Sequence, residues 1–199
     1  MKRFLHVGCG QKTKESTTRA FNTQSWEEVR FDIDHRVKPD VVGTMTDMGA
    51  IDSLTVDAIY SSHNIEHLYP HEVGVALAEF YRVLKKDGFV MITCPDLQSV
   101  CQLIADDKLL EPAYTSPAGP IAPIDMVYGY RPSMAAGNLY MSHRSGFTQK
   151  TLSGTFRNAG FKSVAVARRE AQFDLFCLAS KKELAENELI TLAKQHFPQ

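Results

Sequence analysis

A glycine-rich turn near the start of the sequence has the residue types that let a backbone approach a ligand closely. Gly8, Cys9 and Gly10 follow the short apolar run at residues 4–7, which predicts a strand ending at the turn. The turn lacks the GK[ST] ending of a phosphate-binding loop, and Thr13 stands where the dinucleotide fingerprint GxGxxG needs its third glycine. The pattern therefore favours a ligand without a pyrophosphate, with a purely structural turn as the alternative.

A pair of acidic residues stands at the end of the next apolar run, residues 29–33. In "RFDIDH", Asp32 and Asp34 follow Gly10 at the spacing, about 20 residues, at which an acidic side chain accepts hydrogen bonds from ribose hydroxyls. The alternative is that these side chains only cap the end of the strand. Taken with the glycine turn, they predict an adenosine-type ligand across the first two strand ends.

The length and charge of the chain limit the folds it can adopt and the partners it can bind. The 199 residues suit one α/β domain, which we place over residues 1–199. The 22 Lys and Arg residues balance the 23 Asp and Glu residues, so no global field attracts nucleic acid or an anionic membrane. The apolar run near the N-terminus is too short for a signal peptide, and no stretch reaches the roughly 18 apolar residues of a membrane span.

The four cysteines, at positions 9, 94, 101 and 177, predict reduced thiols. None forms a CxxC pair, so we expect no structural zinc and no other metal site. Three of them lie in apolar stretches, where a free cysteine packs as a small hydrophobic residue. Unpaired cysteines are typical of the cytoplasm, which is the expected location.

Short apolar runs separated by helical patterns predict the elements that position these residues. The runs at 4–7, 29–33, 40–42, 56–60 and 89–94 are continuous rather than alternating, as in a parallel sheet buried on both faces. Between the last two, apolar residues at helical spacing predict a helix from Pro70, with Lys85 and Lys86 at its end and Gly88 as its stop.

The C-terminal part predicts two more helices and an antiparallel pair of strands. Thr148 is placed to cap a helix that stops at Gly160. The segments "KSVAVAR" and "FDLFCLAS" follow as strands too close together for a parallel crossover. Residues 182–197 predict a closing helix. Strands that alternate with helices indicate a doubly wound, Rossmann-like α/β sheet.

Residues 105–146 break this alternation. They contain five prolines and four tyrosines, among them Tyr140. A connection of this length is uncommon in a compact domain and is usually functional or disordered. We expect this insert to act as a lid that brings Tyr140 and His143 toward the reacting group, with a disordered loop or an arm that pairs with a second copy as the alternatives.

Several motifs in their order along the chain resemble a known enzyme family. They are "LHVGCG", "FDIDH", "GTMTDMGAI", "VDAIYSSHNIEHL", "LAEFYRVLKKDGFVMITCPD" and "GFTQKTLSGTFRNAGF". Together they are similar to the class I S-adenosylmethionine-dependent methyltransferases, and most of all to the small type 11 branch. The resemblance implies a seven-stranded sheet of order 3-2-1-4-5-7-6 with the last strand antiparallel. The chain departs from the family at Lys12, where a third glycine is usual, and at His6, where an acid is usual. It also departs in the mostly polar segment "KTKESTTRAFNTQSW", which predicts a short or irregular helix.

The resemblance implies roles for residues along the cofactor. Gly8, Cys9 and Gly10 would lie against the methionine part of S-adenosylmethionine. Asp32 would bind the ribose, with Asp34 as second choice. The other expected cofactor contacts are Ile33 on the adenine, Asp47 on the adenine amino group, Met48 beside it, and Ser62 and His63 near the methionine amino group and the methyl.

The resemblance also implies an acceptor side. His63 and His143 are the candidate catalytic residues, and His67, Tyr140 and Arg144 are the candidate substrate contacts. Each has a simpler alternative: His63 as a loop histidine, His67 in packing, and the "YMSHRSGF" turn as the start of the late helix.

Two other functions stay open at this point, a nicotinamide-dependent oxidoreductase and a non-catalytic S-adenosylmethionine-binding module. The missing third glycine and the EHL…RVLKKDG block argue against the oxidoreductase. "SSHN" stands where DNA amino-methyltransferases usually carry [DN]PP[YFW]. We therefore expect a small-molecule methyl acceptor and no nucleic-acid or membrane partner.

Overall fold

A seven-stranded sheet forms the centre of the molecule in the computed structural model, which describes residues 1–198. The strand order is β3-β2-β1-β4-β5-β9-β8, the order expected once the separate β6–β7 hairpin is left out of the numbering. β1 to β5 are parallel, and β9 runs antiparallel to both β5 and β8, as predicted. The strands are β1 (Lys2–Val7), β2 (Trp26–Asp32), β3 (Val41–Val42), β4 (Val56–Ser62), β5 (Leu84–Pro95), β8 (Ser163–Arg169) and β9 (Asp174–Ser180).

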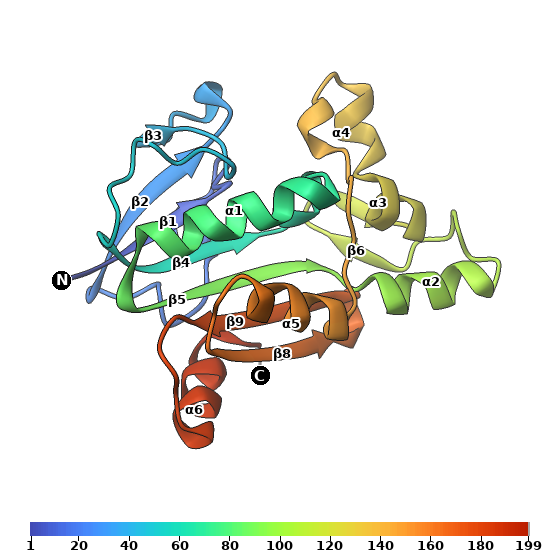
Figure 1. The fold of residues 1–199 in the computed structure, drawn as a ribbon. Helices are drawn as coiled ribbons and strands as arrows, with labels where there is room; N and C mark the ends of the chain where they lie inside the picture. The colour runs from blue at the N-terminus through green and yellow to red at the C-terminus, as the bar shows by residue number, and fades with distance from the viewer. Residues whose placement is uncertain (199) are drawn as a thin grey trace.

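Helices cover both faces of this sheet (Figure 1). α1 (Pro70–Val83) and α5 (Gln149–Asn158) lie side by side on one face. Their apolar stripes pack on the inward residues of the strands and form the larger core, which includes Leu77, Phe80 and Phe156. α5 begins at its predicted cap, since the Thr148 side chain accepts a hydrogen bond from the N–H of Thr151.

The other face is covered by α6 (Glu186–His196) and by the segment that follows the glycine turn. That segment forms only a 3-10 turn, η1 (Lys14–Ser16), so the expectation of a short or irregular helix is confirmed. Phe21 takes the place of a packed helix: its ring stacks on Phe4 at 4.4 Å between centroids and contacts His196 at 4.5 Å. A few aromatic side chains therefore cover a face that a helix would otherwise cover.

The end of α1 differs from the prediction. The helix stops at Val83, and residues 84–88, expected to be its last turn and stop signal, belong to β5. Leu84 takes extended backbone angles because its side chain is fully buried in the larger core. Gly88 has a packing role within β5, since a Cβ there would lie only 3.2 Å from the carbonyl oxygen of Asp57.

The insert begins earlier than the predicted residue 105, with α2 directly after β5, and it leaves and rejoins the sheet at one place. The N–H of Leu97 donates to the carbonyl of Phe147 at 2.9 Å, which closes its base. Between these residues lie α2 (Leu97–Ala105), β6 (Tyr114–Ser116), β7 (Gly119–Ile121), α3 (Pro123–Tyr128) and α4 (Arg131–Ala135). Figure 1 shows them beyond the carboxyl ends of β4 and β5. The insert is therefore folded and lies at the edge where open α/β sheets bind ligands.

The four cysteines are free thiols, as predicted, but Cys101 is exposed on α2 rather than packed with apolar residues. Among residues 1–198, no helix has both the length and the apolar character needed to cross a membrane.

Candidate functional site

The glycine turn is shaped by a neighbouring asparagine. Gly8 and Gly10 have φ of +65° and +54°, a region that favours glycine. The Asn64 amide lies directly over Gly8, where an added Cβ would fall 2.0 Å from its Oδ1. Asn64 Nδ2 donates to the carbonyls of Val7 at 3.2 Å and Ser62 at 2.9 Å. Asn64, which the sequence did not single out, thus joins the ends of β1 and β4 and requires glycine at position 8.

Asp32 holds the turn from the end of β2. Its two carboxylate oxygens accept the backbone N–H groups of Gly10 at 2.8 Å and Asp34 at 2.9 Å. Each oxygen keeps a further lone pair, so the carboxylate can still accept from a ligand hydroxyl. Asp34 is engaged differently: hydrogen bonds from the Arg36 side chain and backbone lower its pKa to about 2. Asp32 is therefore the better placed of the two acids for a ligand at the turn.

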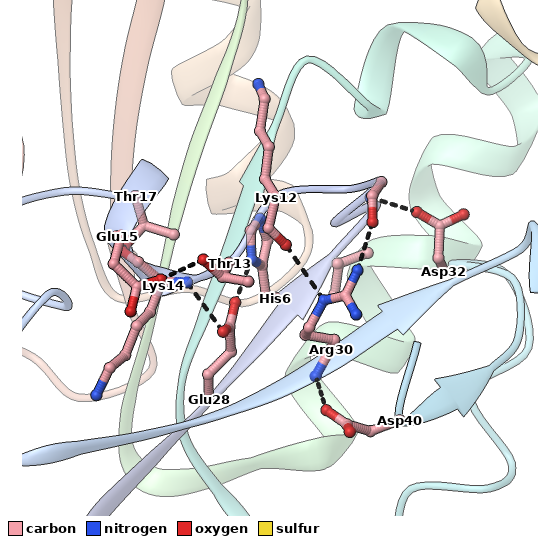
Figure 2. Close-up of polar contacts among 12 residues, drawn as sticks. His6, Lys12, Thr13, Lys14, Glu15, Thr17, Glu28, Arg30, Asp32 and Asp40 are labelled. Carbon is pink, nitrogen blue, oxygen red and sulfur yellow. Dashed lines mark hydrogen bonds and ion pairs between the residues drawn. The ribbon is translucent and has the colours of Figure 1, made fainter. Parts of the chain in front are cut away.

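Arg30, in the middle of β2, organises the loops around the turn (Figure 2). Its guanidinium donates to the carbonyls of Gly10 at 2.6 Å, Lys12 at 3.2 Å and Lys38 at 2.9 Å. Its backbone N–H donates to Asp40 at 2.7 Å. No sequence motif signals this role, because the bonds go to backbone carbonyls that any residue supplies. Arg30 therefore stabilises the loop after the glycine turn, which forms a 3-10 turn rather than an α-helix.

His6 has a similar supporting role (Figure 2). Its Nδ1 lies 2.6 Å from Glu28 Oε1, and Glu28 Oε2 accepts the N–H of Lys14 at 2.9 Å. Burial lowers the pKa of His6, and the Glu28 carboxylate opposes that shift. The pair ties η1 to β2. His6 stands where the resembling family usually has an acidic residue, and here it is paired with an acidic residue of the neighbouring strand.

A cavity of about 600 Å³ lies between the glycine turn, the end of β2, residues 43–46 and the return of the insert; we call it the first cavity. It gathers most of the residues expected to bind a cofactor or substrate. Those that line it are Gly8, Cys9, Gly10, Asp32, Ile33, Ser62, His63, His67, Tyr140 and Arg144.

Asp47 and Met48 do not line the first cavity, contrary to expectation. Met48 is fully buried in the larger core, and its N–H donates to Glu79 at 2.8 Å. The exposed Asp47 side chain accepts the N–H of Gly49. Residues 44–46 line the cavity instead, because the turn after β3 points them inward and Met48 into the core.

A second cavity, of about 980 Å³, lies under the insert. Its walls come from the β6–β7 hairpin, α3, the β8–β9 connection and the C-terminal residues. His143 lines this cavity, whereas Tyr140 and Arg144 line the first. The two cavities share five residues: Lys12, Ser62, His63, His67 and Met141. They therefore meet at the carboxyl end of β4.

His63 lies at this junction in a constrained conformation. Its φ is +54°, which is uncommon for a residue with a Cβ. Its ring nitrogens lie 3.3 Å from Glu66 Oε1 and 3.5 Å from Asp174 Oδ2. Loss of solvation lowers the pKa of His63, but the carboxylates of Asp174 and Glu66 outweigh it and raise that pKa to about 9. The protonated ring is a hydrogen-bond donor, which does not suit the part of a base.

His67 and His143 meet below the junction, with ring centroids 4.9 Å apart. His143 Nδ1 lies 2.8 Å from the carbonyl of Met126, and burial lowers the pKa of its ring. Glu66, whose side chain is fully buried, holds the segment with its backbone, since its carbonyl accepts the N–H of Arg144 at 2.8 Å. The loop after β4 is thus packed directly against the return of the insert.

Comparison with known proteins gives one family and one fold. Residues 5–92 match the model of a family described as a methyltransferase domain. No curated protein matches the sequence.

Three solved structures illustrate the shared fold. A SAM-dependent methyltransferase from Archaeoglobus fulgidus is 15% identical, with 90% of this chain and 86% of that chain covered and a TM-score of 0.58. One from Methanosarcina mazei is 13% identical, with 92% and 93% covered and a TM-score of 0.59. The 1,6-didemethyltoxoflavin-N1-methyltransferase of Burkholderia thailandensis, solved with 1,6-didemethyltoxoflavin and S-adenosylhomocysteine, is 17% identical, with 91% and 71% covered and a TM-score of 0.57.

At these identities the structures show the fold alone, while the family match adds the domain type over β1 to β4, α1 and most of β5. The match, which covers residues 5–92, and the shared fold support the resemblance to the class I S-adenosylmethionine-dependent methyltransferases of the type 11 branch.

Proposed function

We propose that the chain transfers a methyl group from S-adenosylmethionine in the first cavity to a small-molecule acceptor in the second. One observation carries this proposal: the two cavities meet at the carboxyl end of β4 and share Ser62 and His63. Methyl transfer from a sulfonium is a direct displacement, so the enzyme must hold the nucleophile and the methyl carbon in line at near-contact distance. Two cavities that meet at one point suit this requirement.

In the first cavity, the cofactor would lie along the strand ends from β4 to β2. The turn at Gly8 and Gly10 would pack against the methionine part, which needs close backbone approach. Asp32 would accept from the ribose hydroxyls with its remaining lone pairs. Ile33, whose side chain is exposed at the rim, would cover one face of the adenine. Asp47 and Met48 have no role in this arrangement, because both lie outside the cavity.

In the second cavity, the walls suit a flat acceptor with an anionic group. Aromatic side chains that line it include Tyr60, Tyr114, Tyr130, Phe173 and Phe176. Its acids are already paired, Asp125 with Arg131 and Asp174 with Arg169. Lys12 and Arg19 also line it and form no ion pair among residues 1–198. The excess charge is therefore positive, and the volume lies within the usual range of small-molecule sites.

The insert would serve as the lid of both cavities. It contributes Tyr140 and Arg144 to the first and His143 to the second. The Arg144 guanidinium lies 4.7 Å from the centre of the Tyr69 ring, which anchors the insert beside the start of α1. A roof over the junction would exclude water and fix the angle of the acceptor.

Calorimetry with S-adenosylhomocysteine, S-adenosylmethionine and NAD tests the cofactor assignment. We expect both adenosyl compounds to bind and NAD not to bind, and failure of both to bind at millimolar concentration contradicts the proposal. Methyl transfer is then measured against small aromatic acids with a hydroxyl or amino group.

A chain in which a short Gly/Ser linker replaces residues 112–134 tests the lid. We expect it to keep cofactor binding and to lose methyl transfer. Unchanged transfer to the same acceptor contradicts the lid.

A further inference from the structure

Glu66 is the most unusual polar residue of the structure. Its side chain is 0% exposed, and neither carboxylate oxygen has a hydrogen-bond partner among residues 1–198. A buried carboxylate without donors is strongly destabilising, so native proteins pair such groups or place them on a metal ion. The His63 ring lies 3.3 Å from Oε1 and supplies a positive charge on that side, but no ion pair reaches Oε2 among residues 1–198.

Two histidines converge on this carboxylate from separate parts of the chain. His67 follows Glu66 in the 3-10 turn η3 (Ile65–His67), and His143 comes from the return of the insert. One ligand atom from each of Glu66, His67 and His143 lies within 4.8 Å of the other two. They form a cluster of one carboxylate and two imidazoles at the base of the second cavity.

His143 is held in the manner of a metal ligand. Its Nδ1 lies 2.8 Å from the carbonyl of Met126, which fixes the proton on Nδ1 in the neutral ring. Nε2 then carries the lone pair. A backbone carbonyl that binds the other ring nitrogen is the usual support of a metal-binding histidine.

His67 has one unfavourable contact when its ring is neutral. Its Nδ1 lies 3.0 Å from the carbonyl of Ser142, and its Nε2 lies 3.1 Å from the carbonyl of His63. A neutral imidazole has a single N–H, so one ring nitrogen turns its lone pair toward a carbonyl oxygen. A Zn–N bond is about 2.0–2.1 Å long, so the ring must turn away from that carbonyl to bind a metal, and the turn removes the repulsion.

We propose that Glu66, His67 and His143 bind a divalent transition-metal ion, for which Zn²⁺ is the best fit. Two imidazoles and one carboxylate are a common three-ligand set for Zn²⁺ and leave at least one position open. His67 and His143 line the second cavity, so the open position faces it.

Metal binding does not depend on methyl transfer, but a catalytic role of the ion rests on the proposed function. In methyl transfer, the ion would bind an oxygen or nitrogen of the acceptor in the second cavity, lower the pKa of that group and fix its direction. The cysteines predicted no metal site, and His143 lies far from Glu66 and His67 in the sequence, so no spacing motif reveals the cluster.

Calorimetry with Zn²⁺ alone tests the proposal on the full chain after treatment with a chelator, without S-adenosylmethionine. We expect one Zn²⁺ per chain at roughly micromolar affinity or tighter. Glu66→Gln and His143→Gln should each weaken binding tenfold or more, since the first loses the charged oxygen ligand and the second loses the imidazole. His71→Gln is the matched control, because His71 is exposed on α1 and lies outside the cluster. Mn²⁺ should bind more weakly than Zn²⁺.

The opposite results would overturn the site. Absence of binding at one equivalent would show that the His63 ring, 3.3 Å from Glu66, balances the charge of that carboxylate without a metal. Binding that is unchanged in both ligand variants would place the ion elsewhere. If a variant unfolds, the visible spectrum of the wild-type chain with Co²⁺ decides: we expect a low-symmetry histidine site, and an octahedral aqueous spectrum contradicts it. Methyl transfer plays no part in these measurements, so the two proposals fail separately.

Discussion

Replacing Asp32 should affect stability as well as cofactor binding. Its side chain is 8% exposed, and both oxygens accept backbone N–H groups, from Gly10 at 2.8 Å and Asp34 at 2.9 Å. Hydrogen bonds to a charged group contribute about 1.5–3 kcal/mol each. Asp32→Asn keeps one acceptor oxygen and turns an amide N–H toward the other donor. It therefore loses one such bond and the charge, at a cost of about 1.5–3 kcal/mol.

The expected changes can be measured in two assays. For a chain of this size, a loss of about 1.5–3 kcal/mol lowers the melting temperature by roughly 3–12 °C. The affinity for S-adenosylhomocysteine should also fall by roughly tenfold or more, because a ribose hydroxyl loses a charged acceptor. Differential scanning fluorimetry gives the first value and calorimetry the second. The ribose-binding role that the sequence implies for Asp32 concerns the cofactor alone, and the bonds from Gly10 and Asp34 add the effect on stability.

Asp34→Asn is the matched control. Asp34 bonds mainly to Arg36, whose side chain is 67% exposed, and surface pairs of this kind contribute little. We expect a melting temperature and an affinity close to those of the wild type. The reasoning is refuted if Asp34→Asn weakens cofactor binding more than Asp32→Asn, or if Asp32→Asn leaves both values unchanged.

Three further substitutions test the site and its support. Gly8→Ala should abolish tight binding of S-adenosylhomocysteine in calorimetry, because its Cβ would lie 2.0 Å from Asn64 Oδ1; Gly10→Ala, with no atom within 4 Å of its Cβ, should weaken binding less. Arg30→Lys should lower both the melting temperature and cofactor affinity, since a single ammonium cannot reach the several carbonyls that the guanidinium binds. Burial lowers the pKa of His196 to about 4, below its ordinary value. As the pH falls from about 6.5 toward 4, the unfolded chain therefore binds a proton at His196 that the folded chain does not bind, and the folded state loses stability. Urea unfolding should show about 2 kcal/mol less stability at about pH 5 than at about pH 7.5 from this group, and His196→Gln should remove that part of the slope.

The central fold was predictable because continuous apolar runs and helical spacing determine it. β4 and most of β5 are buried on both faces, so their apolar runs stand out against the polar connections. The end of α1 was not predictable, because Leu84 and Gly88 are placed by packing on neighbouring strands rather than by local preference. The same holds for Phe21, which covers the second face without any helical pattern.

The first cavity was predictable where residues stand directly at strand ends, as Gly8, Asp32 and Ser62 do. It was not predictable where a turn decides which way the side chains point: residues 44–46 face the cavity, whereas Met48 faces the core. Contacts to backbone carbonyls, such as those of Arg30, leave no pattern in the sequence. Glu66 and His143 come together only when the insert is folded.

A crystal structure of the chain with bound S-adenosylhomocysteine tests the central claim most directly. We expect the ribose hydroxyls on Asp32, the adenine against Ile33, and the sulfur at the junction beside Ser62 and His63, facing the second cavity. A cofactor bound outside the first cavity, or one whose sulfur faces away from the second cavity, would contradict the account.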